Sequence, residues 1–281
     1  MPILLKKLLL EVGLDRRHYE ELWEDAPPIA DYDTYITSMN KSLGEKTWFV
    51  DKIDFDCLVD FGCADGSLLK KVHAMRPDVK LVGYDIDAGM EQRFKKNNPD
   101  IEFTTDWNYA VGVARKHSRS VVLLSSVIHE VYSYADKTHD IPKFWKNIFG
   151  SGFKYVVIRD TIPDRIDIIK PKDFQEDVAK VKGKVDQKYL QDFEKKWGPI
   201  DSSYRLFVRF ILTYRYKENW TRESLENYMP LSYSTLLRKV PSNYKIIDGA
   251  NYQFRPVAAS FENEYDIKLR VNTHLSMILS K

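Results

Sequence analysis

Cysteine is scarce in this sequence of 281 residues, which contains only Cys57 and Cys63. A disulfide scaffold is therefore excluded, and a reducing compartment such as the cytoplasm is the simpler expectation. Residues 1–10 are apolar, but Lys6 and Lys7 interrupt them and no small-residue cleavage site follows. We expect an amphipathic helix there rather than a signal peptide.

Long apolar runs and an excess of one charge are missing as well. No stretch reaches the ~18 apolar residues of a membrane span, so none is expected. Lys plus Arg number 43 against 41 Asp plus Glu, a formal net charge of +2, which offers no large electrostatic footprint for nucleic acid. The sequence does have 43% hydrophobic residues, with 17 Tyr, 14 Phe and 6 Trp, enough for a sizeable globular core.

Short β-rich runs alternate with helical ones between residues 56 and 160. That alternation predicts a doubly wound, mostly parallel α/β sheet with helices on both faces. Ligands of such sheets bind at the carboxyl ends of the strands, beside the topological switch point. The predicted strands are 57–61, 80–84, 101–104, 121–125 and 155–159, and the predicted helices are 67–75, 89–97, 107–117 and 141–149.

The remaining segments are expected to frame this sheet. Residues 1–50 have helical spacing and are interpreted as an N-terminal helical cap. Residues 51–281 form the main domain, in which 163–235 is an insertion interpreted as a helical substrate lid. The final third is expected to hold helices at 222–228 and 234–239 and strands at 244–247, 253–261 and 273–279.

Two features at strand ends point to a nucleoside ligand. Asp60, Gly62, Ala64 and Gly66 form a small-residue turn between the first strand and its helix, where backbone can approach a ligand closely. The spacing is neither a dinucleotide fingerprint nor a P-loop. Asp85 ends the second strand, where a carboxylate can accept both hydroxyls of a ribose. The alternatives are a tight turn without a ligand and a helix cap, although Asp87 suits the cap better.

This assembly, over about residues 55–160, resembles the class I S-adenosylmethionine-dependent methyltransferases. Their first motif is matched by Asp60, Gly62 and Gly66, with Ala64 where glycine is more usual, and their second motif is matched by Asp85. The resemblance implies a seven-stranded sheet whose last strand, 273–279 here, is antiparallel. It also implies S-adenosyl-L-methionine as cofactor, held by Asp60, Gly62, Cys63, Ala64, Gly66, Asp85, Ile86, Asp106, Trp107 and Ser125.

The fourth predicted strand runs into Ser125-Ser-Val-Ile-His129-Glu130. This segment is similar to that of small-molecule O-methyltransferases, in which the matching histidine is the catalytic base. The resemblance therefore implies that His129 removes a proton from the acceptor, with Glu130 as its orienting partner. The chemistry is reasonable because an imidazole titrates near neutrality. A buried histidine that only shapes the pocket is the alternative, and no metal is expected.

Nucleic-acid chemistry is only partly excluded. Residues 125–132 contain no proline, so the Asp/Asn-Pro-Pro-Tyr/Phe motif of amino-methylating DNA enzymes is absent, and no Pro-Cys nucleophile occurs. The segment 205–217 interleaves cations with Phe207, Phe210, Tyr214 and Tyr216. It could bind nucleic acid by stacking, but an amphipathic helix whose cations lie at the edge of a core is the favoured interpretation.

We conclude from the sequence that the chain is a methyltransferase acting on an oxygen or nitrogen of a small-molecule or nucleoside-type acceptor. An enzyme that uses S-adenosylmethionine for another transfer, a non-catalytic binder of that cofactor, and an RNA or DNA methyltransferase remain as alternatives. Neither the acceptor nor the oligomeric state can be derived from these residues.

Overall fold

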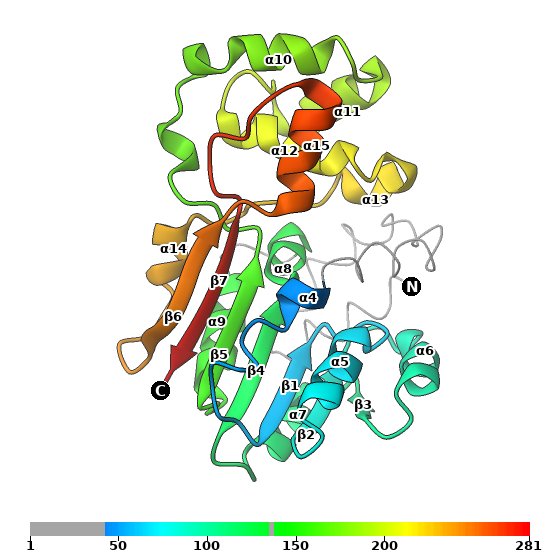
Figure 1. The fold of residues 1–281 in the computed structure, drawn as a ribbon, viewed down its shortest axis with the longest axis vertical. Coiled ribbons are helices and arrows are strands. Elements are labelled where there is room, and N and C mark those ends of the chain that lie inside the picture. Colours follow the sequence, from blue (N-terminus) through cyan, green and yellow to red (C-terminus); the bar gives the residue numbers. More distant parts are fainter. Residues whose placement is uncertain (1–42, 135–137) are drawn as a thin grey trace. The chain divides into compact units, whose positions relative to one another are not determined.

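A seven-stranded sheet organises the chain in the computed structural model, which describes residues 43–134 and 138–281. Its strands lie in the order β3-β2-β1-β4-β5-β7-β6, and β1 to β5 pair in parallel. Figure 1 shows β7 running opposite to β5 and β6, as expected. The strands are β1 Cys57–Phe61, β2 Lys80–Tyr84, β3 Glu102–Thr104, β4 Ser120–Ser125, β5 Tyr155–Asp160, β6 Lys245–Tyr252 and β7 His274–Ser280.

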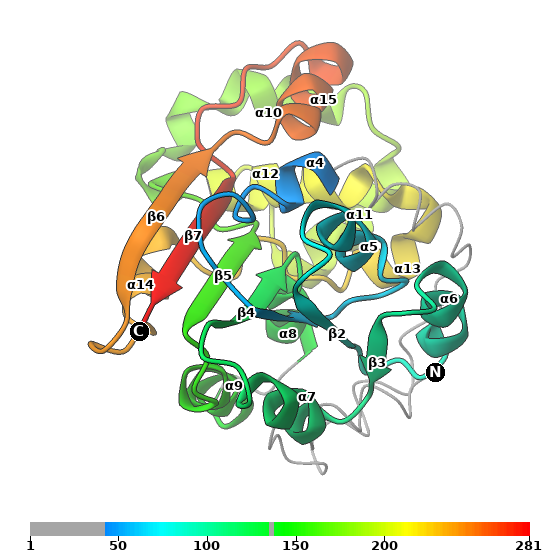
Figure 2. The same cartoon turned by 60° about the horizontal axis from the view of Figure 1, so that its bottom comes forward.

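Helices cover both faces of this sheet, which confirms the doubly wound α/β prediction. Figures 1 and 2 show α4 and α5 on one face and α7 and α9 on the other. The strands between them are buried on both sides because each is a near-continuous apolar run. The helices of this part are α4 Leu43–Lys46, α5 Ser67–Met75, α6 Met90–Asn97, α7 Trp107–Ala114, α8 Ile128–Tyr134 and α9 Asp140–Gly150.

The strand register brings the carboxyl ends of the parallel strands level with one another. Asp60 near the end of β1 pairs with Gly83 on β2 and Leu123 on β4. Ser125 at the end of β4 pairs with Arg159 on β5. Polar residues that follow these strands therefore share one edge, at the β1/β4 switch point.

A second compact unit consists of two separate stretches, 161–239 and 250–275, whereas the described part of the sheet unit comprises 43–134, 138–160, 240–249 and 276–281. The sequence predicts the first stretch as an insertion but not the second. Of residues 253–261, predicted as a strand, 255–261 belong instead to helix α15. The helices of this unit are η2 Ile166–Ile168, η3 Pro171–Asp173, α10 Gln175–Lys182, α11 Gln187–Trp197, α12 Tyr204–Tyr214, η4 Lys217–Asn219, α13 Trp220–Glu223, α14 Tyr233–Leu237 and α15 Arg255–Tyr265.

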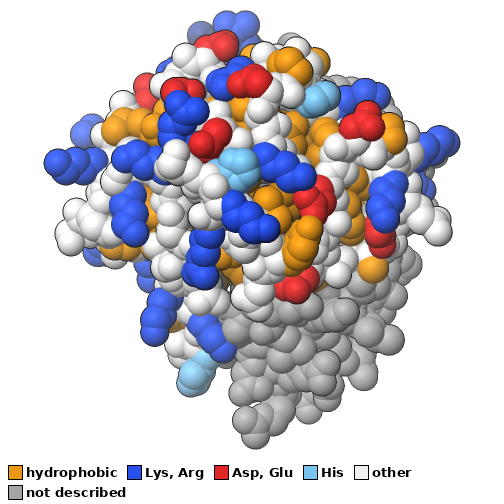
Figure 3. Space-filling model, turned by 90° about the horizontal axis from the view of Figure 1, so that it is seen from below, with side chains coloured by type: hydrophobic (Ala, Val, Ile, Leu, Met, Phe, Trp, Pro, Cys, Tyr) orange, Lys and Arg blue, Asp and Glu red, His pale blue; other side chains and the backbone are white. Residues whose placement is uncertain are grey.

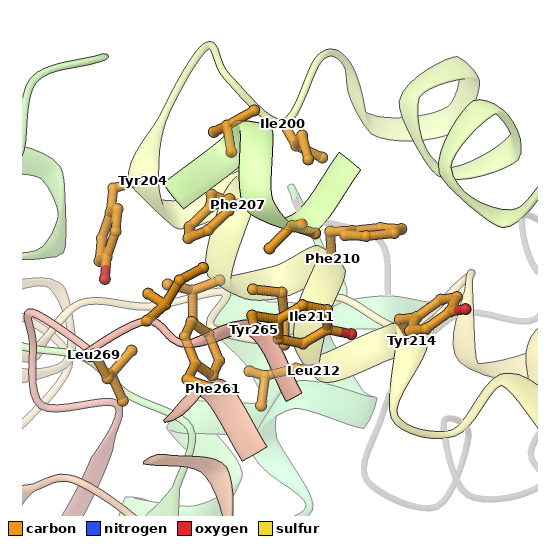
Figure 4. Close-up of a cluster of buried hydrophobic side chains, with 14 of the residues drawn as sticks. Ile200, Tyr204, Phe207, Phe210, Ile211, Leu212, Tyr214, Phe261, Tyr265 and Leu269 are labelled. Carbon is orange, nitrogen blue, oxygen red and sulfur yellow. The ribbon is translucent and has the colours of Figure 1, made fainter. Parts of the chain in front are cut away.

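Helix α12 is the core helix of this second unit. Its residues Phe207, Phe210 and Ile211 are fully buried, and Figure 4 shows them gathered with Phe261 and Tyr265 of α15. The rings of Phe207 and Phe261 meet edge to face at a centroid distance of 6.3 Å. The aromatic side chains of the 205–217 segment are thus mainly core residues.

Most of the predicted N-terminal cap lies outside the described residues, which begin at residue 43, so that prediction stays untested beyond α4. Within the described residues, no helix combines the length and apolarity that crossing a bilayer requires.

Candidate functional site

The turn after β1 is built from residues with left-handed backbone. Gly62, Ala64 and Gly66 have φ values of 80°, 47° and 74°. The Gly62 N–H donates to the carbonyl oxygen of Tyr84 at 2.8 Å, which ties the turn to β2. A Cβ on Gly66 would lie 2.5 Å from the Phe94 ring, so only glycine fits there. Ala64 adopts a similar conformation with a side chain, at a cost of about 1 kcal/mol.

Asp85 lies directly against this turn. Its Oδ2 accepts the Ala64 N–H at 2.8 Å and its Oδ1 accepts the Asp87 N–H at 2.9 Å. Burial raises the pKa of Asp85 to about 6, although these backbone hydrogen bonds oppose the shift. Asp87 leads into α6 by accepting the Gly89 N–H at 2.8 Å. Asp85 is therefore not the cap of that helix. The hydrogen bond from Ala64 to Asp85 joins the turn after β1 to the acid after β2.

Asp65, which the sequence analysis did not single out, fixes the far end of the turn. Its Oδ1 accepts the Ser67 N–H at 3.1 Å and its Oδ2 accepts the Ser67 hydroxyl at 2.7 Å. The Asn97 amide at the end of α6 donates to the same Oδ2 at 3.2 Å. Short-range hydrogen bonds of this kind are typical of Asp in turns, so the i+2 spacing to Ser67 was the available signal.

Two further predicted cofactor residues line the neighbourhood of the turn. Cys63 is buried, and burial raises the pKa of its thiol well above the usual value, so it stays a thiol. Ile86, next to Asp85, is half-buried. Cys63 contributes packing and Ile86 an apolar surface beside the carboxylate.

Asp106 and Trp107 take structural positions at the start of α7. The Asp106 Oδ1 accepts the Asn108 N–H at 2.8 Å and so caps the helix. The Trp107 side chain is 2% exposed and its ring meets that of Phe61 at 5.2 Å. The Trp107 indole is a core residue, and its predicted contact with the cofactor stays a prediction.

His129 is held by a carboxylate from the neighbouring strand. Its Nδ1 lies 2.7 Å from Oδ1 of Asp160, the last residue of β5, and both side chains are buried. The Asp160 Oδ2 accepts the Ile128 N–H at 2.7 Å and the His129 N–H at 3.4 Å. Asp160 thus binds the first turn of α8 and the imidazole together.

The His129 ring contacts Asp160, whereas the sequence analysis expected Glu130 as its orienting partner. Glu130 is half-buried and acts through its charge on Lys46, whose pKa it raises. Alternate residues of a strand point to opposite faces, so the acid at the end of β5 reaches α8 while Arg159 points away from it.

Lys46 and Asp60 form a buried charged centre on the α4 face of the sheet. Lys46 is 5% exposed and Asp60 is 3% exposed. Burial and the charge of Arg159 lower the pKa of Lys46 to about 8, and Asp60 and Asp160 oppose that shift. Burial raises the pKa of Asp60 to about 7, and Lys46 opposes it. The sequence analysis missed Lys46, because a lysine in a four-residue helix carries no motif.

Ser125 and Arg159 sit side by side at the ends of β4 and β5. Arg159 is 3% exposed, its Nη1 donates to the Ser126 hydroxyl at 2.9 Å, and its Nη2 lies 3.7 Å from the Glu45 carboxylate. Among the residues that the structure describes, the Ser125 hydroxyl and the Glu45 Oε2 are buried without a hydrogen-bond partner. Buried polar atoms normally have hydrogen-bond partners. Buried polar atoms without one, close to the carboxyl ends of β4 and β5, therefore indicate a place for a polar ligand or water.

Comparison with known proteins gives fold-level likeness only. No family model and no curated protein matches the sequence. Among solved structures, the chain is similar to the pyocyanin biosynthetic protein PhzM, with 10% identity over 89% of this chain and 58% of that chain and a TM-score of 0.49. It is also similar to the plantazolicin methyltransferase BamL, solved with a triazolic desmethylPZN analog and SAH, with 10% identity over 99% and 98% of the two chains and a TM-score of 0.47.

A third similar structure is the O-methyltransferase family 2 protein from Planctomyces limnophilus DSM 3776 in complex with apigenin. Identity is 11% over 90% of this chain and 62% of that chain, and the TM-score is 0.47. This chain thus spans 58% of the pyocyanin protein and 62% of this one. At such identities the chemistry has to be argued from the residues above.

Proposed function

We propose that this protein is an S-adenosylmethionine-dependent methyltransferase that acts on an oxygen or nitrogen of a small-molecule or nucleoside-type acceptor. The proposal rests chiefly on Asp85, whose carboxylate meets the left-handed turn of 62–66 at 2.8 Å at the carboxyl edge of the sheet. A turn without the spacing for a pyrophosphate, joined to an acid that can accept ribose hydroxyls, fits a nucleoside with a non-phosphate tail.

The residues of the edge fit the parts of S-adenosylmethionine in order. Asp85 would bind the ribose, Asp60 the amino group and Lys46 the carboxylate of the amino-acid part, since opposite charges then meet in a buried centre. When bound, the cofactor supplies an electrophilic methyl group. Trp107 is given no side-chain role in this proposal, because its indole is in the core.

His129 is proposed as the base that receives the acceptor proton. The bond between its Nδ1 and Asp160 leaves the lone pair of the neutral ring on Nε2. A base matters most for a hydroxyl acceptor, because an oxygen becomes a good nucleophile as its proton leaves, whereas a neutral amine already has a lone pair. The dyad therefore favours oxygen methylation.

A small acceptor is favoured over nucleic acid. The rings of Phe207, Phe210 and Tyr214, which would have to stack on bases, are at most 9% exposed. On the face shown in Figure 3, basic side chains are interspersed with acidic ones over its described part. We keep the proposal that the helical insertion 163–235 is a substrate lid. It rests only on chain connectivity, because the chain passes from β5 into the second unit directly after Asp160.

The first test is calorimetric titration with S-adenosylmethionine and S-adenosylhomocysteine. We expect micromolar binding by the wild type and by the exposed control Asp100→Ala, and none by Asp85→Ala. No binding by the folded wild type would overturn the proposal. In turnover with acceptor pools, S-adenosylhomocysteine as product supports methyl transfer, methylthioadenosine indicates transfer of another group, and binding without product indicates a non-catalytic binder.

A further inference from the structure

We propose that Asn98 is a positioning residue of the cofactor site, whose buried amide holds the turn of 62–66 against Asp85. The inference rests on the proposed function, because it takes that turn and that acid as the place where the cofactor binds. Asn98 follows the last turn of α6 as its C-terminal cap and is 3% exposed. Its side chain therefore lies inside the sheet unit, at the end of the helix that comes after Asp85.

The Asn98 amide contacts the turn directly. Its Nδ2 donates to the carbonyl oxygen of Asp65 at 3.0 Å and to that of Phe94 at 3.2 Å. A flipped amide would set Oδ1 against both carbonyl oxygens, so the orientation of the amide is fixed. Nδ2 also fills the place where a Cβ on Gly66 would lie. The turn and the amide are thus fitted to each other.

Helix α6 connects the two halves of the site through its two ends. Just before its start, the Asp87 N–H donates to Asp85 Oδ1 at 2.9 Å. At its end, Asn98 holds the carbonyl oxygen of Asp65. Ala64, the neighbour of Asp65, donates its N–H to Asp85 Oδ2 at 2.8 Å and so closes the ring of contacts. Loosening the ring at Asn98 should therefore be felt at the bond between Ala64 and Asp85.

The turn needs to be held because its backbone is strained. Ala64 has a φ of 47°, which is disfavoured for a residue with a Cβ, and such residues keep this conformation only where surrounding contacts impose it. Among residues 43–134 and 138–281, the Asn98 Oδ1 is buried without a hydrogen-bond partner, which disfavours folding. An apolar side chain would suit this place better if packing were its only task. The amide is explained by the turn that it holds.

Asn98→Leu tests this assignment, because leucine branches at the same carbon, removes both donors and changes no charge. Hydrogen exchange of the Ala64 N–H in the protein without ligand should become about tenfold faster. The pKa of Asp85, read from the NMR titration of its carboxyl group, should rise, since the Ala64 N–H favours the ionised acid. Asp87 and Asp60 act on Asp85 by charge and are the same in both proteins.

Calorimetry with S-adenosylhomocysteine at about pH 8 measures the consequence for the cofactor. Asp85 is largely ionised there, so a loss of affinity reports geometry and not protonation. We expect Asn98→Leu to bind about tenfold more weakly than the wild type. A purely structural asparagine would change the unfolding temperature and leave the Ala64 exchange, the Asp85 titration and the affinity of the folded protein as they were.

Asn251→Leu is the matched control, because the Asn251 amide on β6 also donates to a backbone carbonyl, that of Ile162 at 3.3 Å. All three measurements should keep their wild-type values in it. Should the leucine at position 98 prevent folding, Asn98→Ala removes the same donors with a smaller side chain and is measured in its place. Unchanged Ala64 exchange, Asp85 titration and affinity in the folded variant would overturn the proposal. Failure of the wild type to bind S-adenosylhomocysteine would instead remove the proposed function, and the first two measurements would still decide whether Asn98 holds the turn.

Discussion

Asp160 and His129 are joined across 31 residues of sequence by a 2.7 Å contact between a carboxylate oxygen and Nδ1 of the ring. The other oxygen of Asp160 accepts the N–H of Ile128 at the start of α8. One side chain therefore sets both the helix on which the imidazole stands and the rotation of that imidazole. A histidine held in this way is pre-organised to receive a proton at Nε2.

Replacing Asp160 by Asn should lower kcat by about 100-fold to 10,000-fold, because an amide can present its NH2 to Nδ1 and favour the wrong tautomer. Steady-state kinetics with a turned-over acceptor measures the loss. The affinity for S-adenosylhomocysteine should stay unchanged, since Asp160 is assigned to no part of the cofactor. Asp164→Asn, at a more exposed acid nearby in sequence, is the control. An equal loss of cofactor affinity would show that Asp160 acts only as a structural anchor.

Cofactor affinity should depend on pH through Asp85. Burial raises the pKa of this acid to about 6, and the ionised form accepts the ribose hydroxyls. Binding thus favours the deprotonated acid, so the Asp85 contribution should make affinity fall toward tenfold per pH unit below about 6 and add no further dependence above it, where the remaining slope belongs to Asp60, whose pKa is raised to about 7. Calorimetry over this range checks the slope. In Asp85→Asn the slope below pH 6 should shrink, and an unchanged slope would place the titrating group elsewhere.

Gly83→Ala should destabilise the sheet unit by about 1–3 kcal/mol. A Cβ at Gly83 would lie 2.5 Å from the Phe94 ring and 2.8 Å from the Cys63 sulfur, so packed side chains must move. Gly112→Ala in α7 is the matched control, because nothing lies within 4 Å of its Cβ position. That variant should gain about 0.5–1 kcal/mol from helix propensity. Urea unfolding of both variants tests the sign of each change.

Phe207→Ala should lower the stability of the helical unit by about 3–5 kcal/mol, since the side chain is fully buried in its core. Tyr216→Ala, at an edge position that is 37% exposed, should cost far less. Thermal unfolding followed by circular dichroism compares them. If Phe207→Ala left stability intact and weakened RNA binding instead, the result would favour the interpretation of 205–217 as a nucleic-acid-binding segment.

The sequence predicts the sheet unit best, where hydrophobic periodicity and turn chemistry agree. Strands 57–61 and 80–84 and helix 67–75 match the structure to the residue. Residues 253–261 fail because apolar and polar residues alternate over a short run, although Pro256 stands in the first turn of α15, a favoured position in helices. The local sequence pattern alone could not decide between the two-residue period of a strand and the 3.6-residue period of a helix.

Candidate site residues could be found in the sequence where they belong to a recognisable turn or strand end. They could not be found where their place in the site depends on burial and contacts in the folded chain. The sequence indicates Gly62, Gly66 and Asp85 because each follows the end of a predicted strand. It does not indicate Asp160 and Lys46, since their roles depend on contacts made across the sheet. Trp107 is buried in the core, and its predicted contact with the cofactor stays a prediction.

The division of the helical unit into 161–239 and 250–275 has a mechanical consequence. The backbone passes from one unit to the other after residues 160, 239, 249 and 275. Each unit is therefore assembled from separate stretches of chain, which are interrupted by stretches of the other unit. Cutting one of the four connections leaves the other three to link the two units covalently. Proteolytic nicking at residue 240 should thus yield two fragments that stay together until denaturant is added, and neither unit can be excised as one continuous piece of chain.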